Sequence, residues 1–438
     1  MIKGDKILKG KWLLVGGKIY DPFKEKYLKG NILINNGKFE GLTTDSVASG
    51  DINTLDCSNK LITHPFIDLH AHFREPGRED KETLESGCLS ALYGGYTTVC
   101  LMPNTNPPID TPELIKFIID KTSDYPISVL PIGAITNAQS GKELTEIGLM
   151  VKEGAVAISD DGIPVEDSRI MRYALEYSKM FGIPVINHAE DVFLRSGAVM
   201  NESVESTKLG LEGSPHITES IMVSRDLMIN EYVNGRLHVP HVSSKESVEI
   251  IRRYKKSYDT ISAEVTPHHI YFNDSHLNSF NSNLKVAPPI RSEEHRKSLI
   301  DGLRDGTIDC IATDHAPHNI EEKESDFIHA SCGMIGLETA FSGSYSALSK
   351  QKFSIEKIIS LFTSGPCKVM NIEKKFLEEG SVAEIVVIDL EKEWRVSKDD
   401  FKSKSSNSGF IDESLNSRVI YTISGKDCFI NDTKQYAK

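Results

Sequence analysis

Hydrophobic residues recur with two different periods along the chain, and the change of period divides it into three parts. Short apolar runs separated by turns occupy residues 11–60, where Asn36-Gly37 predicts a hairpin. From residue 61 to residue 365, short runs rich in β-branched residues alternate with longer stretches of helical period. Strand-like runs return after residue 365. The pattern therefore predicts β-rich ends flanking an alternating β/α segment.

The alternating segment contains eight predicted strands, each followed by a stretch with one apolar helical face. After Asp167, for example, Ile170 and Ala174 share such a face, and Gly182 ends the helical pattern. Eight strands alternating with helices over about 250 residues are typical of a (β/α)8 TIM-type barrel. The predicted strands are 61–70, 96–102, 127–133, 155–159, 183–188, 236–241, 261–267 and 308–314.

The two β-rich ends are expected to pack together as one small domain beside the barrel. Residues 1–60 would form its N-terminal part and residues 366–438 its C-terminal part, with the catalytic barrel spanning residues 61–365. The stretch 397–408 is rich in Ser, Lys and Asp and is predicted to be an exposed loop. The fold class is α/β, with a composite β domain.

Composition and charge narrow the functional classes. The chain has 438 residues and a formal net charge of −13, which argues against a nucleic-acid partner because binding phosphates requires clustered Lys and Arg. No apolar run reaches the roughly 18 residues needed to cross a membrane. The seven cysteines are scattered without a CxxC pair, which favours free thiols in a reducing cytoplasm.

Candidate ligands for a metal ion fall at the ends of the predicted strands. In a (β/α)8 enzyme the catalytic groups lie at the C-terminal ends of the strands. Any one histidine at such a position is most simply explained as a structural residue. Several histidines and aspartates that all fall at strand ends favour a metal site instead. Imidazole and carboxylate groups together suit Zn²⁺ or a similar divalent ion. The candidates are His70, His72, Asp160, Asp161, His188, His241 and Asp314.

The residue types also indicate a chemistry. A divalent ion lowers the pKa of a bound water to about 7 and polarises a carbonyl oxygen. A carboxylate beside that water can accept its proton and pass it to a leaving nitrogen. Asp314 is the candidate for this role, and the alternative is that it serves as a ligand alone. Arg74 lies two residues beyond His72 and is a candidate for binding a substrate carboxylate through two hydrogen bonds.

Eight short motifs follow one another along the barrel segment and carry a family resemblance. They are HAHFREPG (70–77), MPNTNPP (102–108), SDDG (159–162), NHAED (187–191), HVSS (241–244), AEVTPHH (263–269), PPIR (288–291) and ATDHAPH (312–318). Together they resemble the signatures of the dihydroorotases, members of the amidohydrolase superfamily, and are most similar to the bacterial class I branch. The motifs keep the family's order over roughly residues 60–340.

The resemblance implies the reversible cyclisation of N-carbamoyl-L-aspartate to L-dihydroorotate plus water, in pyrimidine (UMP) biosynthesis. It also implies one or two Zn²⁺ per subunit. Some relatives use a carbamylated lysine on the fourth strand, but AISDDG offers none, so Asp161 is the first choice there and Asp160 the second. Asn104 and His318 match the family's contacts to the ring carboxylate. The residues that match the other metal ligands are His70, His72, His188, His241 and Asp314.

Some features leave alternatives open. Ala287 stands where many relatives have asparagine, which puts one substrate contact in question. A hydantoinase or allantoinase is the alternative activity, and a non-catalytic partner subunit is the alternative role; the filled ligand positions and the missing lysine favour a dihydroorotase. The remaining histidines are expected to be structural or exposed, although His268 and His269 could contact the ligands. The expected partners are a small-molecule substrate, further copies in a homo-oligomer and an associated aspartate transcarbamoylase, with neither nucleic acid nor membrane.

Overall fold

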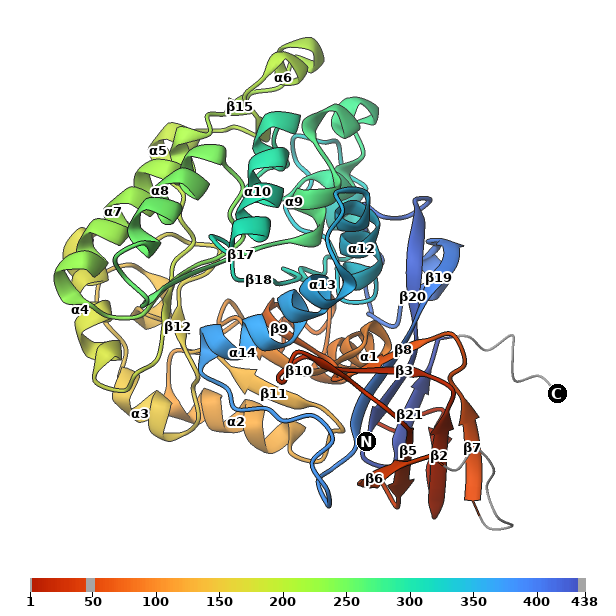
Figure 1. Ribbon diagram of the computed structural model, residues 1–438. Coiled ribbons are helices and arrows are strands. Elements are labelled where there is room, and N and C mark those ends of the chain that lie inside the picture. Colours follow the sequence, from red (N-terminus) through yellow and green to blue (C-terminus); the bar gives the residue numbers. More distant parts are fainter. Residues whose placement is uncertain (1, 45–51, 432–438) are drawn as a thin grey trace.

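The computed structural model describes residues 2–44 and 52–431 (Figure 1). Strands from both ends of the chain share one seven-stranded sheet. Its order is β1 (Lys6–Ile7), β21 (Asp427–Ile430), β20 (Ser414–Ser424), β19 (Glu384–Arg395), β8 (Leu61–Thr63), β3 (Lys18–Asp21) and β4 (Lys26–Leu28). A four-stranded sheet beside it has the order β6 (Lys38–Thr43), β5 (Asn31–Asn35), β2 (Lys11–Val15) and β7 (Ile52–Asp56).

Alternating side chains explain how these two sheets pack. In β5, Ile32 and Ile34 are buried while their neighbours are partly exposed, as the period of two in a strand requires. They belong to one apolar cluster with Ile385 and Ile423 of the seven-stranded sheet. The hairpin predicted at Asn36-Gly37 joins β5 to β6, and both residues have positive φ (49° and 79°), as a tight hairpin turn of this kind needs.

A second set of strands is parallel, as predicted for the segment after residue 61. One run has the order β11 (Ser128–Pro131), β10 (Tyr96–Leu101) and β9 (Phe66–Ala71). The other has the order β12 (Ile158–Ser159), β13 (Val185–Ile186), β16 (Leu237–Val239), β17 (Ile261–Val265) and β18 (Cys310–Ile311). Single parallel bridges join the two runs at Gly133–Ile158 and at Ala71–His315.

The first predicted strand, 61–70, is wrong as a single element. It is divided into β8, which pairs with β3 and β19, and β9, which pairs with β10. The break falls at His64-Pro65, where proline lacks the N–H that a continuing ladder would use. The division matters for function because β9, rather than β8, carries the histidines.

Helices surround the parallel strands in Figure 1. The helix predicted after Asp167 is α4, whose first turn is capped by the Asp167 carboxylate and whose residues Ile170 and Ala174 are buried. None of the helices in the described ranges is both long and apolar enough to cross a membrane. The helices are α1 (Leu84–Gly94), α2 (Pro112–Thr122), α3 (Ile147–Lys152), α4 (Ser168–Lys179), α5 (Val192–Arg195), α6 (Val204–Leu209), α7 (Ile217–Val233), α8 (Lys245–Lys255), α9 (Pro267–Tyr271), α10 (Glu293–Asp305), α11 (Ile320–Lys323), α12 (Ala340–Lys350), α13 (Ile355–Phe362) and α14 (Ser364–Met370).

Short elements complete the chain. A small parallel pair, β14 (Met200–Asn201) and β15 (Gly213–Ser214), flanks α6. Single 3-10 turns are η1 (Asn137–Gln139), η2 (Asp274–Ser279), η3 (Ser282–Leu284) and η4 (Lys398–Asp400). The prediction of an exposed loop over 397–408 is wrong for its second half, because Ser405, Asn407 and Ser408 are buried. Their polar groups are hydrogen-bonded inside the protein, so a polar sequence did not mean exposure.

Candidate metal and substrate site

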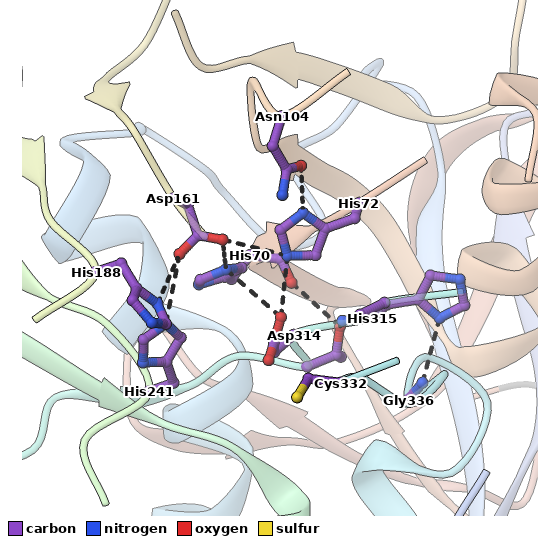
Figure 2. Close-up of polar contacts among 12 residues, drawn as sticks. His70, His72, Asn104, Asp161, His188, His241, Asp314, His315, Cys332 and Gly336 are labelled. Atoms are coloured by element: carbon purple, nitrogen blue, oxygen red, sulfur yellow. Dashed lines mark hydrogen bonds and ion pairs between the residues drawn. The ribbon is translucent and has the colours of Figure 1, made fainter. Parts of the chain in front are cut away.

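The two histidines at the end of β9 point one nitrogen each into a common space (Figure 2). His70 Nδ1 lies 2.8 Å from Glu264 Oε1. Its buried Nε2 has no hydrogen-bond partner within residues 2–44 and 52–431, but it faces Asp161 Oδ2 at 3.4 Å and Asp314 Oδ1 at 3.6 Å. His72 Nδ1 lies 2.7 Å from Asn104 Oδ1, and its Nε2 lies 3.0 Å from Asp314 Oδ1. Each of the two imidazole rings is therefore held through its Nδ1 atom, and its Nε2 atom faces the aspartate carboxylates.

Asp161 lies between two pairs of histidines. Its Oδ2 faces the Nε2 atoms of His70 and His72, at 3.4 and 3.5 Å. Its Oδ1 faces His188 Nδ1 at 3.6 Å and His241 Nε2 at 3.4 Å. The structure thus brings four histidines from β9 and from the loops after β13 and β16 around one carboxylate, as Figure 2 shows.

Asp160 points elsewhere. Its carboxylate accepts hydrogen bonds from the backbone N–H groups of Ile135 and Thr136, at 2.8 and 3.1 Å, and from the Thr136 hydroxyl. Neighbouring residues of an extended chain face opposite sides, so only one of the two aspartates can face the histidines. The geometry favours Asp161 over Asp160 as a ligand.

The residues fit a divalent metal ion. Two groups, His70 with Asp161 and His241, and His70 with His72 and Asp314, each place three ligand atoms within 4.8 Å of one another. A metal would give His70 Nε2 the partner that it lacks. Burial raises the pKa of Asp161, but His70, His188 and His241 outweigh burial and hold that pKa well below its usual value. The ionised carboxylate and imidazoles are a donor set typical of zinc and similar ions.

Three of the predicted residues have a backbone conformation that side-chain-bearing residues rarely adopt. The φ angles of Arg74, His241 and Asp314 are 60°, 32° and 46°. A left-handed backbone conformation costs free energy in any residue other than glycine, and such residues are frequent at functional sites. All three lie just after a strand end: Arg74 after β9, His241 after β16 and Asp314 after β18.

The three predicted substrate contacts lie beside this group. Arg74 is partly buried and donates from Nε to the Pro317 carbonyl at 3.2 Å; burial lowers its pKa to about 10, against the opposing effect of Asp314. Asn104 holds His72 through Oδ1. His318 Nε2 donates to the Cys332 carbonyl at 2.8 Å.

The protonation of His318 follows from its surroundings. Burial and the nearby charge of Arg74 lower the pKa of His318 to about 3. Its Nδ1 lies 3.2 Å from Lys81 Nζ and 2.8 Å from Glu322 Oε2. The ring is therefore neutral at physiological pH. The positive charges of Arg74 and Lys81 lie beside it, partly offset by Glu322, and suit a substrate carboxylate.

Sequence reasoning missed two carboxylates that lie beside histidines of this group. Glu264 on β17 contacts His70 Nδ1 at 2.8 Å and His238 Nε2 at 3.1 Å, although His238 was expected to be structural. Glu190 lies 3.7 Å from His188 Nε2. Glu264 could have been found from the sequence, because it is an acidic residue inside the apolar strand ISAEV. A buried charge needs a partner, so such a residue points to a buried ion pair.

The other histidines have separate environments. His269 is held by Thr266 Oγ1 at 2.7 Å and by the Pro288 carbonyl at 3.0 Å, which is a structural role. His268 is buried, and its Nε2 has no hydrogen-bond partner among the described residues. His295 Nδ1 accepts the Lys245 N–H at 2.9 Å, so that nitrogen is already occupied. Ala287, the residue that departs from the family pattern, lines a cavity of about 10 Å³ with Glu190 and Cys332.

Comparison with solved structures identifies the fold. The structure resembles L-hydantoinase from Arthrobacter aurescens with a TM-score of 0.83, at 22% sequence identity and 96% coverage of both chains. A D-hydantoinase matches with a TM-score of 0.82, at 18% identity and 96% and 95% coverage. The chain therefore has the fold of these proteins, and its buried histidine–aspartate group could hold a metal ion.

Comparison of amino-acid sequences identifies the family. A family model described as dihydro-orotase-like matches residues 59–247. The dihydroorotase of Caldicellulosiruptor saccharolyticus is 42% identical over 93% of this chain and 95% of that protein. The dihydroorotase of Acetivibrio thermocellus is 43% identical over 94% and 97%. The chain belongs to the dihydroorotase family.

Proposed function

We propose that the protein is a zinc-dependent dihydroorotase, which interconverts N-carbamoyl-L-aspartate and L-dihydroorotate plus water in pyrimidine biosynthesis. The observation that carries the proposal is the position of Asp161 and Asp314 among four buried histidines, in a chain about 42% identical to dihydroorotases over nearly its full length. The lower identity to hydantoinases, 22%, favours dihydroorotate over the hydantoins as substrate.

The finer architecture is part of the same proposal. We infer that the eight parallel strands close into a (β/α)8 barrel over residues 61–365, which the two bridging contacts at Gly133 and Ala71 support. Residues 1–60 and 366–438 would form the composite β domain. The mixed order of N-terminal and C-terminal strands in the seven-stranded sheet supports this second inference.

One or two Zn²⁺ ions would be held by His70, His72, His188, His241, Asp161 and Asp314. A bound ion would lower the pKa of a water and polarise the ring carbonyl. Asp314 is suited to move the proton: burial raises its pKa, but His72, His70 and His241 outweigh burial and keep the carboxylate ionised. In ring opening it would accept a proton from the attacking water and deliver it to the ring nitrogen; ring closure reverses these transfers.

The substrate carboxylate would be bound by Arg74, Asn104 and His318. Arg74 is anchored through Nε, so its Nη atoms are the groups proposed to donate to the carboxylate. Asn104 uses Oδ1 on His72 and would offer its NH₂ group. His318 would offer Nε2–H in place of its present bond to the Cys332 carbonyl.

Other expectations stay predictions: a cytoplasmic location, a homo-oligomeric state and an assembly with aspartate transcarbamoylase. A hydantoinase or allantoinase, and a non-catalytic partner subunit, are the alternatives to the proposed function.

An absorbance assay of dihydroorotate ring opening distinguishes these functions. It would be run on the purified protein, on the chelated protein, and after zinc is added back. Activity that is lost on chelation and restored by zinc is the expected result. Metal-loaded protein that hydrolyses hydantoin or allantoin but not dihydroorotate would overturn the proposed substrate, and protein that binds no metal and is inert would favour the non-catalytic role.

A further inference from the structure

The segment 402–408, between β19 and β20, lies against the residues around the candidate site. The backbone N–H of Lys404 donates to Glu82 Oε1 at 3.1 Å, and the Ser405 hydroxyl donates to the Lys81 carbonyl at 2.8 Å. Glu82 is fully buried and also contacts His315 Nε2 at 3.3 Å. Through Glu82, the 402–408 segment is thus linked to His315, the residue that follows Asp314.

Asn407 makes the closest connection. Its Oδ1 accepts the His318 N–H at 3.0 Å. Its Nδ2 donates to the carbonyls of Ala316 and Gly333, at 3.1 and 3.2 Å, and its own carbonyl accepts the Ile335 N–H at 2.9 Å. One side chain, only 5% exposed, therefore joins the segment that carries His318 to the segment that carries Gly333.

The chemistry of this connection requires an amide. Asparagine supplies one acceptor and two donors in the same plane, and Asn407 uses all three. An aspartate would keep the acceptor for His318 but would place a carboxylate oxygen against two carbonyl oxygens. An alanine would take the Asn407 partner from the buried His318 N–H and the Ala316 carbonyl, whereas the Gly333 carbonyl would keep Lys323 Nζ at 3.0 Å. A buried backbone group left without a partner is the costly case for a hydrogen bond.

The two joined segments meet at the His318 ring itself. A Cβ atom at Gly333 would lie 2.8 Å from Ala316 Cβ and 3.1 Å from His318 Nε2, so no slack separates them. On the other side of the ring, Nδ1 faces Nζ of Lys81, whose carbonyl is held by Ser405. The nearer contact of Nδ1 is Glu322 Oε2 at 2.8 Å, so the 402–408 segment supports His318 directly through its backbone N–H and only indirectly through Lys81.

We propose that Asn407 is a positioning residue for the reaction, which fixes His318 for the substrate carboxylate. The proposal rests on the proposed function, since His318 is the group that would meet the substrate. Asn407 would not touch the substrate; it would act through His318.

The test is steady-state kinetics on full-length wild type, Asn407→Ala and Asn407→Asp, with Asn230→Ala as the matched control. Asn230 is also buried (1% exposed), on α7, and its side-chain NH₂ faces Thr260. We expect Asn407→Ala to raise the KM for dihydroorotate about 10-fold, with kcat changed by about 2-fold at most and the zinc content unchanged. Asn230→Ala should lower the melting temperature while leaving KM as in wild type.

A second measurement separates positioning from general destabilisation. In a His318→Ala background, Asn407→Ala should change KM by less than about 2-fold, because the residue through which it acts is gone. A full additional 10-fold effect there, or wild-type KM in both Asn407 variants, would overturn the positioning role. If the alanine variant does not fold, the aspartate variant decides by the same criteria. Wild type that is inert toward dihydroorotate would instead defeat the proposed function, and the positioning role with it.

Discussion

Glu264 offers the sharpest test of how the histidines are held. Its carboxylate accepts from His70 Nδ1 at 2.8 Å and from His238 Nε2 at 3.1 Å, and it is 1% exposed. Burial raises its pKa, but His238 and His70 outweigh burial and lower it to about 2, so the carboxylate is charged at all physiological pH values. This charge fixes the His70 tautomer in which Nε2 is free to bind a metal.

Replacing Glu264 by glutamine removes the charge while keeping the shape. Loss of such a partner typically costs about 10- to 100-fold in metal affinity, or roughly 1.4–2.8 kcal/mol. We expect Glu264→Gln to weaken zinc binding by about 10-fold, because the amide oxygen still accepts from His70. Glu264→Ala should weaken it by about 100-fold or more. The zinc dissociation constant would be measured by competition with a chromophoric chelator.

The matched control is Glu384→Gln. Glu384 also contacts a buried histidine, His64, at 3.9 Å and pairs with Lys374 at 3.3 Å, but it lies on β19 in the seven-stranded sheet. The zinc affinity of the Glu384→Gln variant should equal that of the wild type. Zinc binding in Glu264→Gln and Glu264→Ala that is as tight as in this control would refute the inference that Glu264 orients a ligand.

Three further predictions concern the same site. Asp161→Asn should lower the zinc content and reduce turnover by about 10³-fold or more, whereas Asp160→Asn should keep the zinc, as measured by metal analysis; the reverse pattern would exchange the two aspartates. Arg74→Lys should raise the KM for dihydroorotate about 10- to 100-fold, because an ammonium cannot donate two parallel hydrogen bonds, and an unchanged KM would remove Arg74 from the carboxylate site. Chelation should lower the melting temperature by roughly 5 °C or more, with recovery on adding zinc, because an ion bound only by the folded state stabilises it; an identical melting curve with and without chelator would contradict a metal held by six buried residues.

Local pattern was sufficient for much of the fold. The Asn36-Gly37 turn, the buried face of α4 and seven of the parallel strands lie where the sequence predicted them, because turn geometry and the periods of strand and helix are properties of neighbouring residues. The same reasoning put seven candidate ligands at strand ends; six of them lie together in the structure, whereas the Asp160 carboxylate points elsewhere. A local rule failed where one residue interrupted it, at Pro65.

Tertiary structure decided what depends on contacts between distant residues. The side chain of Asp161 rather than Asp160 faces the histidines because of how the end of β12 lies against its neighbours, which no local period reports. Glu264 holds a histidine 194 positions earlier in the chain, and Asn407 binds a backbone group 89 positions away. A polar residue's partner is fixed by the packing of the whole chain. The sequence alone therefore determined the elements and the candidate ligands, whereas the folded structure determined which polar groups hold them in place.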